Sequence, residues 1–379
     1  MVNQKNSEFL QAGFEKLFTN HNLSENNIYE NLIYLRKYVY NQDILEKIIK
    51  SYKIILNGES TNIFRFNEYD KLEFSKLLDN KKKLARYVIY RYKYKTYPQD
   101  KIVEDYPPCV QIEPASVCNF RCVMCYQTDK TFSSKKNGFM GFMKFELFKK
   151  IIDELEGNVE AITFASRGEP TLNKDLVRFL DYCKDKFVAI KINSNLSNLN
   201  EELAEAIFRN NVQTLVISSD APDKANYEKI RVKGNFEKLK KNMELLLDVK
   251  KKFYNTSTII RASGVKISEN QNFDKMKEVY GKFTDSVAFV NYLPWESSYT
   301  NKINYEMNAC SDLWKRIFVW YDGVVNPCDY DYKSLLSKFN YNQTNIKDIW
   351  NSKHYNELRF KHLNKQRSEI YPCKGCTNI

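Results

Sequence analysis

Three cysteines within eight residues carry the clearest chemistry in this 379-residue chain. Cys118, Cys122 and Cys125 have C-x3-C-x2-C spacing, and thiolates spaced in this way can converge on one iron–sulfur cube from a single tight loop. Three thiolates leave one iron of four open to a small molecule, whereas structural clusters and structural zinc sites are normally closed by four ligands. The pattern therefore indicates a reactive cluster, with a zinc or redox cysteine site as the alternative.

This arrangement resembles the radical S-adenosylmethionine (radical SAM) superfamily. In that family the open iron chelates SAM and delivers one electron, which cleaves SAM to methionine and a hydrogen-abstracting 5′-deoxyadenosyl radical. Met124 occupies the position before the third cysteine, where relatives have an aromatic or bulky apolar residue. Tyr126 matches a residue that lies near the adenine in relatives. The resemblance implies a [4Fe–4S] cluster, SAM, and a one-electron reductant such as flavodoxin or ferredoxin.

Composition excludes several other classes. Hydrophobic residues make up 43% and the mean hydropathy is −0.57, as in soluble globular proteins. No run of 18 apolar residues predicts a membrane span, and the first residues do not resemble a signal peptide. Seven of the nine cysteines fall into two metal-type groups, a usage that fits a reducing compartment. We therefore expect a cytoplasmic protein.

The formal charge of +12 raises the question of a nucleic-acid partner. Two thiolate-ligated clusters would lower this charge by about three units. The lysines are dispersed, and the densest runs, at 81–83 and 250–252, are short and typical of solvated helix faces. A small-molecule substrate is favoured over nucleic acid.

Short β-rich runs alternate with helical periodicity after residue 108. We predict strands at 110–113, 161–165, 188–192, 214–218, 257–265 and 287–293, and helices at 141–156, 173–185, 199–209, 224–250 and 272–283. This alternation predicts parallel βα units. The expected fold is α/β, a (βα)6 partial TIM barrel, which is also the fold that the resemblance implies. Ligands in such folds gather at the carboxyl ends of the strands.

The residues that follow the second strand are unusually polar. Gly168, Glu169 and Pro170 resemble the family's Gly-Gly-Glu-Pro segment, which hydrogen-bonds the methionyl amine of SAM, except that Arg167 replaces the first glycine. Glycine permits close backbone approach, and proline fixes the turn before a helix.

Three further strands end in residues that the resemblance relates to SAM. Ser194, in Asn-Ser-Asn, matches a segment near the SAM ribose, and Val265 matches a residue that packs on the adenine. Ser218 and Arg231 match residues that engage the SAM carboxylate, which a guanidinium can grip with two hydrogen bonds. The alternatives are a helix-capping serine, a solvent-exposed arginine and a core valine.

A second cysteine group closes the sequence: Cys310, Cys328, Cys373 and Cys376. Asp322-Gly323 between two β-rich runs predicts a hairpin, and a helix over 345–363 leads back to the terminal C-x2-C. Four thiolates suit a closed zinc site and a [4Fe–4S] cluster equally well by chemistry alone.

The hairpin and Cys328 resemble the auxiliary-cluster domains called SPASM and their shortened form, the twitch domain. A full SPASM set has seven cysteines, so four imply a twitch with one fully ligated auxiliary cluster. Radical SAM enzymes with a similar cysteine order include one that oxidises an aminocyclitol hydroxyl. Such a cluster suits electron acceptance, so the resemblance implies an oxidoreductase. Epimerisation would need a hydrogen donor, and the spare thiols, Cys109 and Cys183, are poorly placed for that role.

Three units are expected along the chain: a helical N-terminal extension (1–105), the partial barrel (106–300) and the twitch (301–379). The expected substrate is a small polyhydroxylated molecule, such as a sugar, aminosugar or cyclitol, as in carbohydrate biosynthesis. A ribosomally made peptide is the alternative. The polar segment 296–301 fits either hydroxyl binding or a solvated linker. No catalytic base can be named from the sequence.

Overall fold

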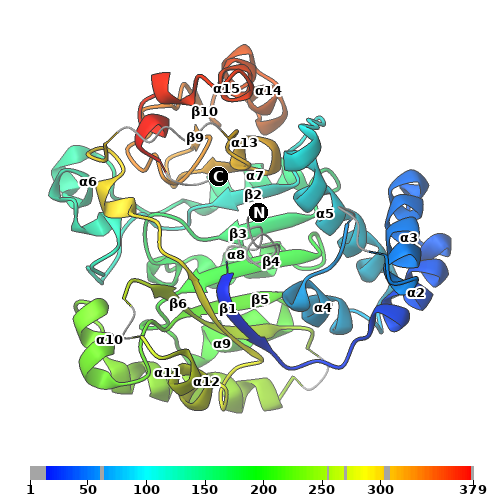
Figure 1. Ribbon diagram of the computed structural model, residues 1–379. Helices are drawn as coiled ribbons and strands as arrows, with labels where there is room; N and C mark the ends of the chain where they lie inside the picture. Colours follow the sequence, from blue (N-terminus) through cyan, green and yellow to red (C-terminus); the bar gives the residue numbers. More distant parts are fainter. Residues whose placement is uncertain (1–13, 60–63, 254–255, 269–270, 303–307, 377–379) are drawn as a thin grey trace.

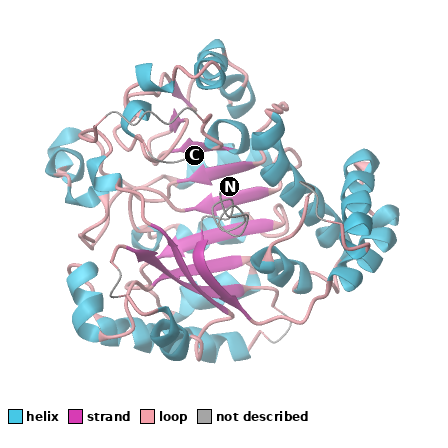
Figure 2. Cartoon of the chain, in the orientation of Figure 1, coloured by secondary structure: helices cyan, strands magenta, loops and turns pink. Residues whose placement is uncertain are grey.

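One ten-stranded sheet forms the centre of the molecule, with helices around it (Figures 1 and 2). The structure is a computed structural model that describes residues 14–59, 64–253, 256–268, 271–302 and 308–376. The strand order is β1-β7-β6-β5-β4-β3-β2-β8-β9-β10. Its two ends, β1 and β10, do not pair with each other, so the sheet is an open, partial barrel.

Six central strands are parallel, as the alternation predicts. They are β2 Cys109–Ile112, β3 Ala161–Phe164, β4 Ala189–Ser194, β5 Thr214–Ser218, β6 Ile259–Lys266 and β7 Ser286–Asn291. Helices follow them in sequence: α7 Phe145–Leu155, α8 Leu176–Tyr182, α9 Glu201–Arg209, α10 Lys224–Ile230, α11 Phe236–Lys251 and α12 Phe273–Tyr280. Their buried faces form one hydrophobic core with outward-facing strand residues such as Val110, Ile162 and Leu215. The predicted partial-barrel fold is confirmed.

The single helix predicted over 224–250 is wrong, because the chain breaks between α10 and α11. Lys233 adopts a positive φ of 72°, which no helix interior tolerates. A Cβ on Gly234 would lie 2.6 Å from the Arg231 carbonyl oxygen, so this turn requires glycine. Asn235 then caps α11 by accepting a hydrogen bond from the Lys238 backbone. The break leaves Arg231 at the carboxyl end of α10.

The C-terminal region contains the predicted hairpin and not the predicted single helix. β8 Arg316–Val319 pairs antiparallel with β9 Val324–Asn326, and Gly323 makes the turn at φ 87°. Short β10 Phe339–Asn340 follows. The helix predicted over 345–363 is instead α14 Ile346–Trp350 and α15 Lys353–Leu363, because the Ser352 side chain caps a new helix through the Tyr355 backbone N–H.

Strand β8 also joins the C-terminal region to the barrel. It pairs in parallel with β2, with Cys109 opposite Arg316 and Ile112 opposite Val319. The hairpin therefore continues the barrel sheet. Through this pairing, the C-terminal region is hydrogen-bonded to β2, the strand that leads into the first cysteine group.

The N-terminal region is helical as expected, with one additional strand. Its helices are α2 Glu25–Tyr34, α3 Gln42–Leu56, α4 Glu68–Ser75 and α5 Lys81–Asp100. The strand, β1 Phe14–Thr19, pairs antiparallel with the edge strand β7. Its sequence alternates apolar and charged residues only weakly, so the pattern does not predict a strand. Hydrogen bonding to the edge strand β7 stabilises the extended conformation instead.

The N-terminal helices cover the amino ends of the barrel strands. Buried residues of α3 and α5 share one core with Cys109, Ala161 and Ala189, which begin β2, β3 and β4. The aromatic side chains Tyr87 and Tyr90 of α5 belong to this core. The extension therefore closes the barrel at the end opposite the cysteine loop.

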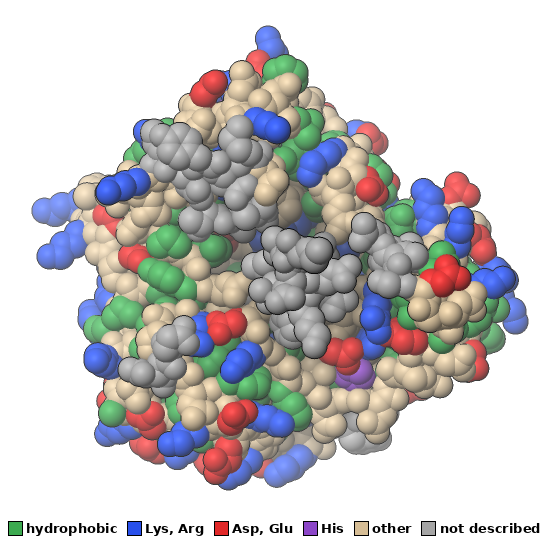
Figure 3. Space-filling model, viewed as in Figure 1, with side chains coloured by type: hydrophobic (Ala, Val, Ile, Leu, Met, Phe, Trp, Pro, Cys, Tyr) green, Lys and Arg blue, Asp and Glu red, His purple; other side chains and the backbone are tan. Residues whose placement is uncertain are grey.

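Surface charge shows no concentration on the face in Figure 3, where Lys and Arg side chains are interspersed with Asp and Glu. Among the helices that the structure describes, none combines the length and apolar character that crossing a membrane requires.

Candidate active site

The first cysteine group lies in the loop between β2 and a short 3-10 helix, Tyr126–Thr128. The Cys125 backbone N–H donates to the Cys122 carbonyl at 3.0 Å, and the Cys125 sulfur accepts from the Gln127 backbone at 3.5 Å. Burial, followed by the neighbouring Cys122, raises the pKa of Cys125 to about 12. Burial also raises the pKa of Cys118, with contributions from both other thiols. The three sulfurs therefore share one buried space.

Arg231 faces this thiol group from the end of α10. Its Nη1 donates to the Cys122 sulfur at 3.4 Å, and its Nε forms an ion pair with Asp220. Asp220 is fully buried, and its other oxygen accepts from the Val265 backbone N–H at 2.7 Å. One carboxylate thus fixes the guanidinium beside the cysteine loop and ties it to β6.

Glu169 is the centre of a second network beside the thiols. Its Oε1 accepts from the Ser194 hydroxyl at 2.6 Å and from the Thr171 hydroxyl at 2.7 Å. Its Oε2 accepts from the Asn195 backbone at 2.7 Å. Burial raises the pKa of Glu169, and this carboxyl in turn raises the pKa of Cys118. The Glu169 side chain is therefore positioned next to the cysteine loop.

Gly168 sits directly against that loop. A Cβ there would lie 2.4 Å from the Ala115 carbonyl oxygen and 2.5 Å from that of Val117. No larger residue fits without moving the segment that leads into Cys118. Pro170 follows at the start of a 3-10 helix, Pro170–Leu172, where its fixed φ suits the first helical position.

Tyr126 packs at the boundary between the barrel and the C-terminal region. Its hydroxyl donates to the Ser166 carbonyl at 2.6 Å, and its ring stacks on Tyr332 at 4.9 Å. Met124 is 8% exposed and belongs to the main hydrophobic core.

A cavity of about 1810 Å³ lies inside the barrel. Its wall includes all three thiols of the loop together with Gly168, Glu169, Ser194, Ser218 and Arg231. The wall also includes Ala309 and Ser311, which flank Cys310. Met124, Pro170 and Val265 are not among the described wall residues. Most of the residues expected at a SAM site therefore line one cavity.

Arg167, which departs from the family's glycine, has a structural partner. It forms a buried bidentate ion pair with Glu113, at 2.8 and 2.6 Å. It also donates to the Tyr332 carbonyl at 3.0 Å and lies over the Trp320 ring at 4.3 Å. Glu113 in turn accepts from the Tyr321 backbone at 3.1 Å. The ion pair fastens the carboxyl ends of β2 and β3 to the C-terminal hairpin.

The second cysteine group is also gathered in space. Burial is the main cause of a raised pKa for Cys310, Cys328 and Cys373, and each is raised further by at least one other thiol of the set. Cys376 contributes to the shift of all three. The four thiols are thus close enough to influence one another's charge.

Segment 296–301 contacts this region directly. The Tyr299 hydroxyl donates to Asp331 at 2.7 Å, and the Asn301 amide donates to the Tyr330 hydroxyl at 2.9 Å. Trp295, just before it, lines the cavity. The segment is therefore packed against the C-terminal region and is not a solvated linker.

Both thiol groups fit iron–sulfur clusters. The thiols of both groups are buried or partly buried and are free of disulfide bonds, and thiolate is the ligand that such clusters take. In the described part of the chain, no three His, Cys, Asp or Glu side chains are positioned to hold a single metal ion. A four-iron cube is larger than one ion, so its thiolates stand farther apart.

Two family profiles match this chain. The radical SAM superfamily profile matches residues 112–269, and the SPASM profile, an iron–sulfur cluster-binding domain, matches residues 310–377. The chain thus contains a radical SAM domain followed by a C-terminal SPASM-type domain. These domains imply SAM and [4Fe–4S] clusters as cofactors, including an auxiliary cluster in the SPASM domain.

Relatives share parts of this arrangement. The mycofactocin maturase MftC of Mycolicibacterium smegmatis is 26% identical over 38% of this chain and 35% of its own length. The chain thus matches about a third of this curated relative. Streptococcus suis SuiB bound to precursor peptide SuiA superposes with a TM-score of 0.51 at 15% identity, covering 96% of this chain and 90% of that chain. BtrN in complex with AdoMet and 2-DOIA gives 0.49 at 18% identity, covering 72% and 93%.

Sequence reasoning missed the polar interior of the barrel. Lys191 on β4 and Arg261 on β6 both line the cavity, as do side chains of α4 and α5, including Tyr69 and Tyr94. The signal was present, because a charged residue inside a strand of a covered parallel sheet must face an enclosed polar space. The sequences of α4 and α5 contain no comparable indication that Tyr69 and Tyr94 line the cavity.

Proposed function

We propose that this protein is a radical SAM oxidoreductase with two [4Fe–4S] clusters. Cys118, Cys122 and Cys125 hold the SAM-binding cluster, and the four C-terminal cysteines hold the auxiliary one. When bound, the first cluster supplies the electron that cleaves SAM to a 5′-deoxyadenosyl radical, and the second supplies a one-electron acceptor.

The chain's own residues bind and orient SAM in this proposal. Glu169 and Ser194, already hydrogen-bonded to each other, face the methionyl amine and the ribose. Arg231, held by Asp220, faces the SAM carboxylate together with Ser218. Tyr126 lies at the same wall of the cavity. Each of these groups is fixed by protein contacts, so little reorganisation is needed when SAM binds.

The reaction we favour is two-electron oxidation of an alcohol on a small polyhydroxylated substrate. The observation that carries this proposal is the single cavity that borders both the cysteine loop and the residues flanking Cys310. Its wall also includes hydrogen-bonding side chains such as Thr163, Asn193 and Thr214. A carbinol held there lies between a hydrogen-abstracting centre and an electron acceptor.

Anaerobic reconstitution tests the cofactor part of the proposal. The protein should hold about eight iron atoms per chain and release 5′-deoxyadenosine when reduced with SAM. A Cys373→Ala variant should hold fewer iron atoms and still cleave SAM, but should yield no oxidised product. Bound zinc without SAM cleavage would contradict the proposal.

Peptide modification is the second candidate. MftC is named a maturase, and SuiB is bound to a precursor peptide. A short gene beside this one, whose peptide transfers deuterium into 5′-deoxyadenosine, would support that candidate over the small molecule. A substrate recovered in an unchanged oxidation state with one 5′-deoxyadenosine per turnover would instead indicate an epimerase.

A further inference from the structure

The inner face of the barrel carries a row of polar residues across four neighbouring strands. Gln111 on β2 pairs with Thr163 on β3, Thr163 with Lys191 on β4, and Lys191 with Thr214 on β5. All four line the cavity. Side chains at one register on one face of a sheet stand next to each other. The interior is therefore equipped for polar contacts well below the cysteine loop.

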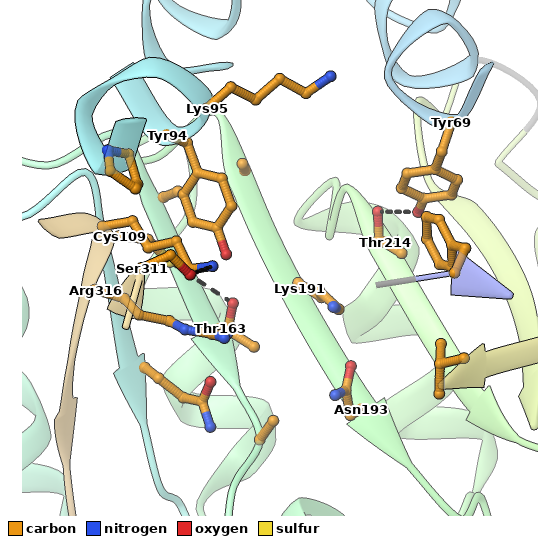
Figure 4. Close-up of a pocket in the computed structure, with 18 of the residues that line it drawn as sticks. Tyr69, Tyr94, Lys95, Cys109, Thr163, Lys191, Asn193, Thr214, Ser311 and Arg316 are labelled. Atoms are coloured by element: carbon orange, nitrogen blue, oxygen red, sulfur yellow. Dashed lines mark hydrogen bonds between the residues drawn. The ribbon is translucent and has the colours of Figure 1, made fainter. Parts of the chain in front are cut away.

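Lys191 has no hydrogen bond or ion pair among the residues that the structure describes. Figure 4 shows its amine pointing into the space between Thr163 and Thr214. Burial lowers the pKa of the Lys191 amine, and the nearby cations Arg261 and Arg316 lower it further, against a smaller opposing effect of Glu73. A lysine amine held near two like charges is unfavourable unless something else compensates it.

Arg261 shows the same lack of compensation. The residue is 5% exposed, and its guanidinium lies over the rings of Tyr69 and Phe14 at 4.7 and 5.0 Å. Its buried Nε has no hydrogen-bond partner, and neither does the Asn193 side-chain oxygen nearby on β4. Within the described residues, no carboxylate pairs with Arg261. Buried polar groups without partners are rare in proteins.

The acids in this part of the molecule are already engaged. Glu73 accepts from the Tyr87 hydroxyl at 2.7 Å and from the Thr214 hydroxyl at 3.1 Å. Asp312 holds Arg316 at 2.7 Å. Other cations of the wall are paired in the same way, as Arg167 is with Glu113 and Arg231 with Asp220. Lys191 and Arg261 differ from them in having no such carboxylate partner among the described residues.

We propose that Lys191 and Arg261, assisted by Arg316, bind an oxyanion group of the substrate, a phosphate or a carboxylate. This inference rests on the proposed function, which makes this cavity the substrate site. An oxyanion would accept hydrogen bonds from both cations and relieve their mutual repulsion. A neutral polyol would leave both charges unpaired.

The site lies at a useful distance from the proposed radical centre. Lys191 precedes Ser194 by three residues on the same strand. A strand rises about 3.3 Å per residue, so the two levels are separated by roughly 10 Å. That separation matches a sugar-sized molecule whose anionic group is held below while a carbinol reaches the cysteine loop.

Binding measurements on the anaerobically reconstituted protein with SAM test this inference. Isothermal titration calorimetry compares glucose 1-phosphate, glucuronate and glucose. We expect at least one anionic sugar to bind ten-fold or more tightly than glucose. Preference for glucose 1-phosphate indicates a phosphate, and preference for glucuronate indicates a carboxylate. Lys191→Met should weaken that binding at least ten-fold, whereas Lys191→Arg, which keeps the charge, should retain most of it.

Lys251→Met is the matched control, because Lys251 is exposed and outside the cavity. Equal affinity for all three sugars, no binding of either anionic sugar, or anionic binding unaffected by Lys191→Met would overturn the inference. Release of 5′-deoxyadenosine without any sugar, measured in parallel, reports on the proposed function separately. If no 5′-deoxyadenosine is released but the anionic sugars still bind in a charge-dependent way, the proposed radical SAM activity is refuted and the anion site is supported.

Discussion

The polar groups at two levels of the barrel differ in whether protein contacts satisfy them. The upper level is the carboxyl ends of the strands, with Glu169 and Asp220, and the lower level is the part of the cavity around Lys191 and Arg261. At the carboxyl ends of the strands, both oxygens of Glu169 and of Asp220 accept hydrogen bonds from the protein. At the lower level, the side chains of Lys191 and Arg261 have no hydrogen-bond or ion-pair partner among the described residues. The upper level is preorganised before any ligand arrives, whereas the lower level is completed by what binds. Functional sites commonly retain such uncompensated groups at the expense of stability.

Removing a thiol at the upper level should have the largest effect. Cys118→Ala should abolish the SAM-binding cluster and lower 5′-deoxyadenosine formation by about 10³-fold or more, because cluster binding requires all three thiolates. Iron analysis and product chromatography measure this. Cys183→Ala is the control, since Cys183 is buried in the core away from the cavity, and it should keep both iron and SAM cleavage. Equal loss in the two variants would contradict the assignment.

Arg167 tests whether the upper level depends on its link to the C-terminal region. Arg167→Met leaves Glu113 buried without its partner, and breaking a buried ion pair in this way costs about 3–5 kcal/mol. The measurement is the midpoint of urea unfolding. Arg36→Met removes an exposed pair with Glu46, and should cost less than about 1 kcal/mol. Similar losses from the two substitutions would show that the link is not important for stability.

Glu169→Gln tests the preorganisation itself. The amide would present a donor to groups that now donate to a carboxylate, so the network around Ser194 and Asn195 would lose at least one hydrogen bond. We expect SAM affinity to fall by about 10–100-fold, measured by equilibrium dialysis. Glu201→Gln, at an exposed pair with Lys252, should leave SAM affinity unchanged. Unaltered binding in the Glu169 variant would remove Glu169 from the SAM site.

The upper level could be predicted from sequence because its residues are local in the chain. Three cysteines in one loop and Gly168-Glu169-Pro170 after one strand are recognisable without a structure, and strand order brings them together. The sequence also indicated Arg231 as a candidate residue, but placed it inside a continuous helix. In the structure, the turn at Lys233 and Gly234 ends α10 at this residue. The backbone conformation of Lys233 and Gly234 determines where α10 ends, and hydrophobic periodicity carries no information about such a turn.

The lower level could not be assembled from sequence. Lys191 and Arg261 lie on strands separated by about 70 residues, and nothing in their neighbourhoods signals that they meet. The closing surface, with Tyr69 and Tyr94, comes from helices that pack through tertiary contacts alone. Strand β1 was missed for the same reason, since pairing with the edge strand β7 forms it.

The smallest expected effect separates the two levels most directly, because this substitution should stabilise the protein, whereas the others should lower stability, ligand affinity or activity. Burial, with Arg261 and Arg316 nearby, lowers the pKa of Lys191 to about 7 from 10.5, while Glu73 and Cys109 oppose the shift. The unfolded chain binds this proton more readily than the folded one. The charged Lys191 amine therefore destabilises the folded protein fully below about pH 7, and this destabilisation decreases as the pH rises from 7 towards 10.5. Lys191→Met should therefore raise the Tm of the sugar-free protein by a few degrees at pH 6, and the gain should shrink by pH 9. Differential scanning fluorimetry at both pH values measures this, with Lys251→Met as an unaffected control. A fall in Tm at pH 6 would mean that Lys191 has a stabilising partner, and the contrast between the levels would be lost.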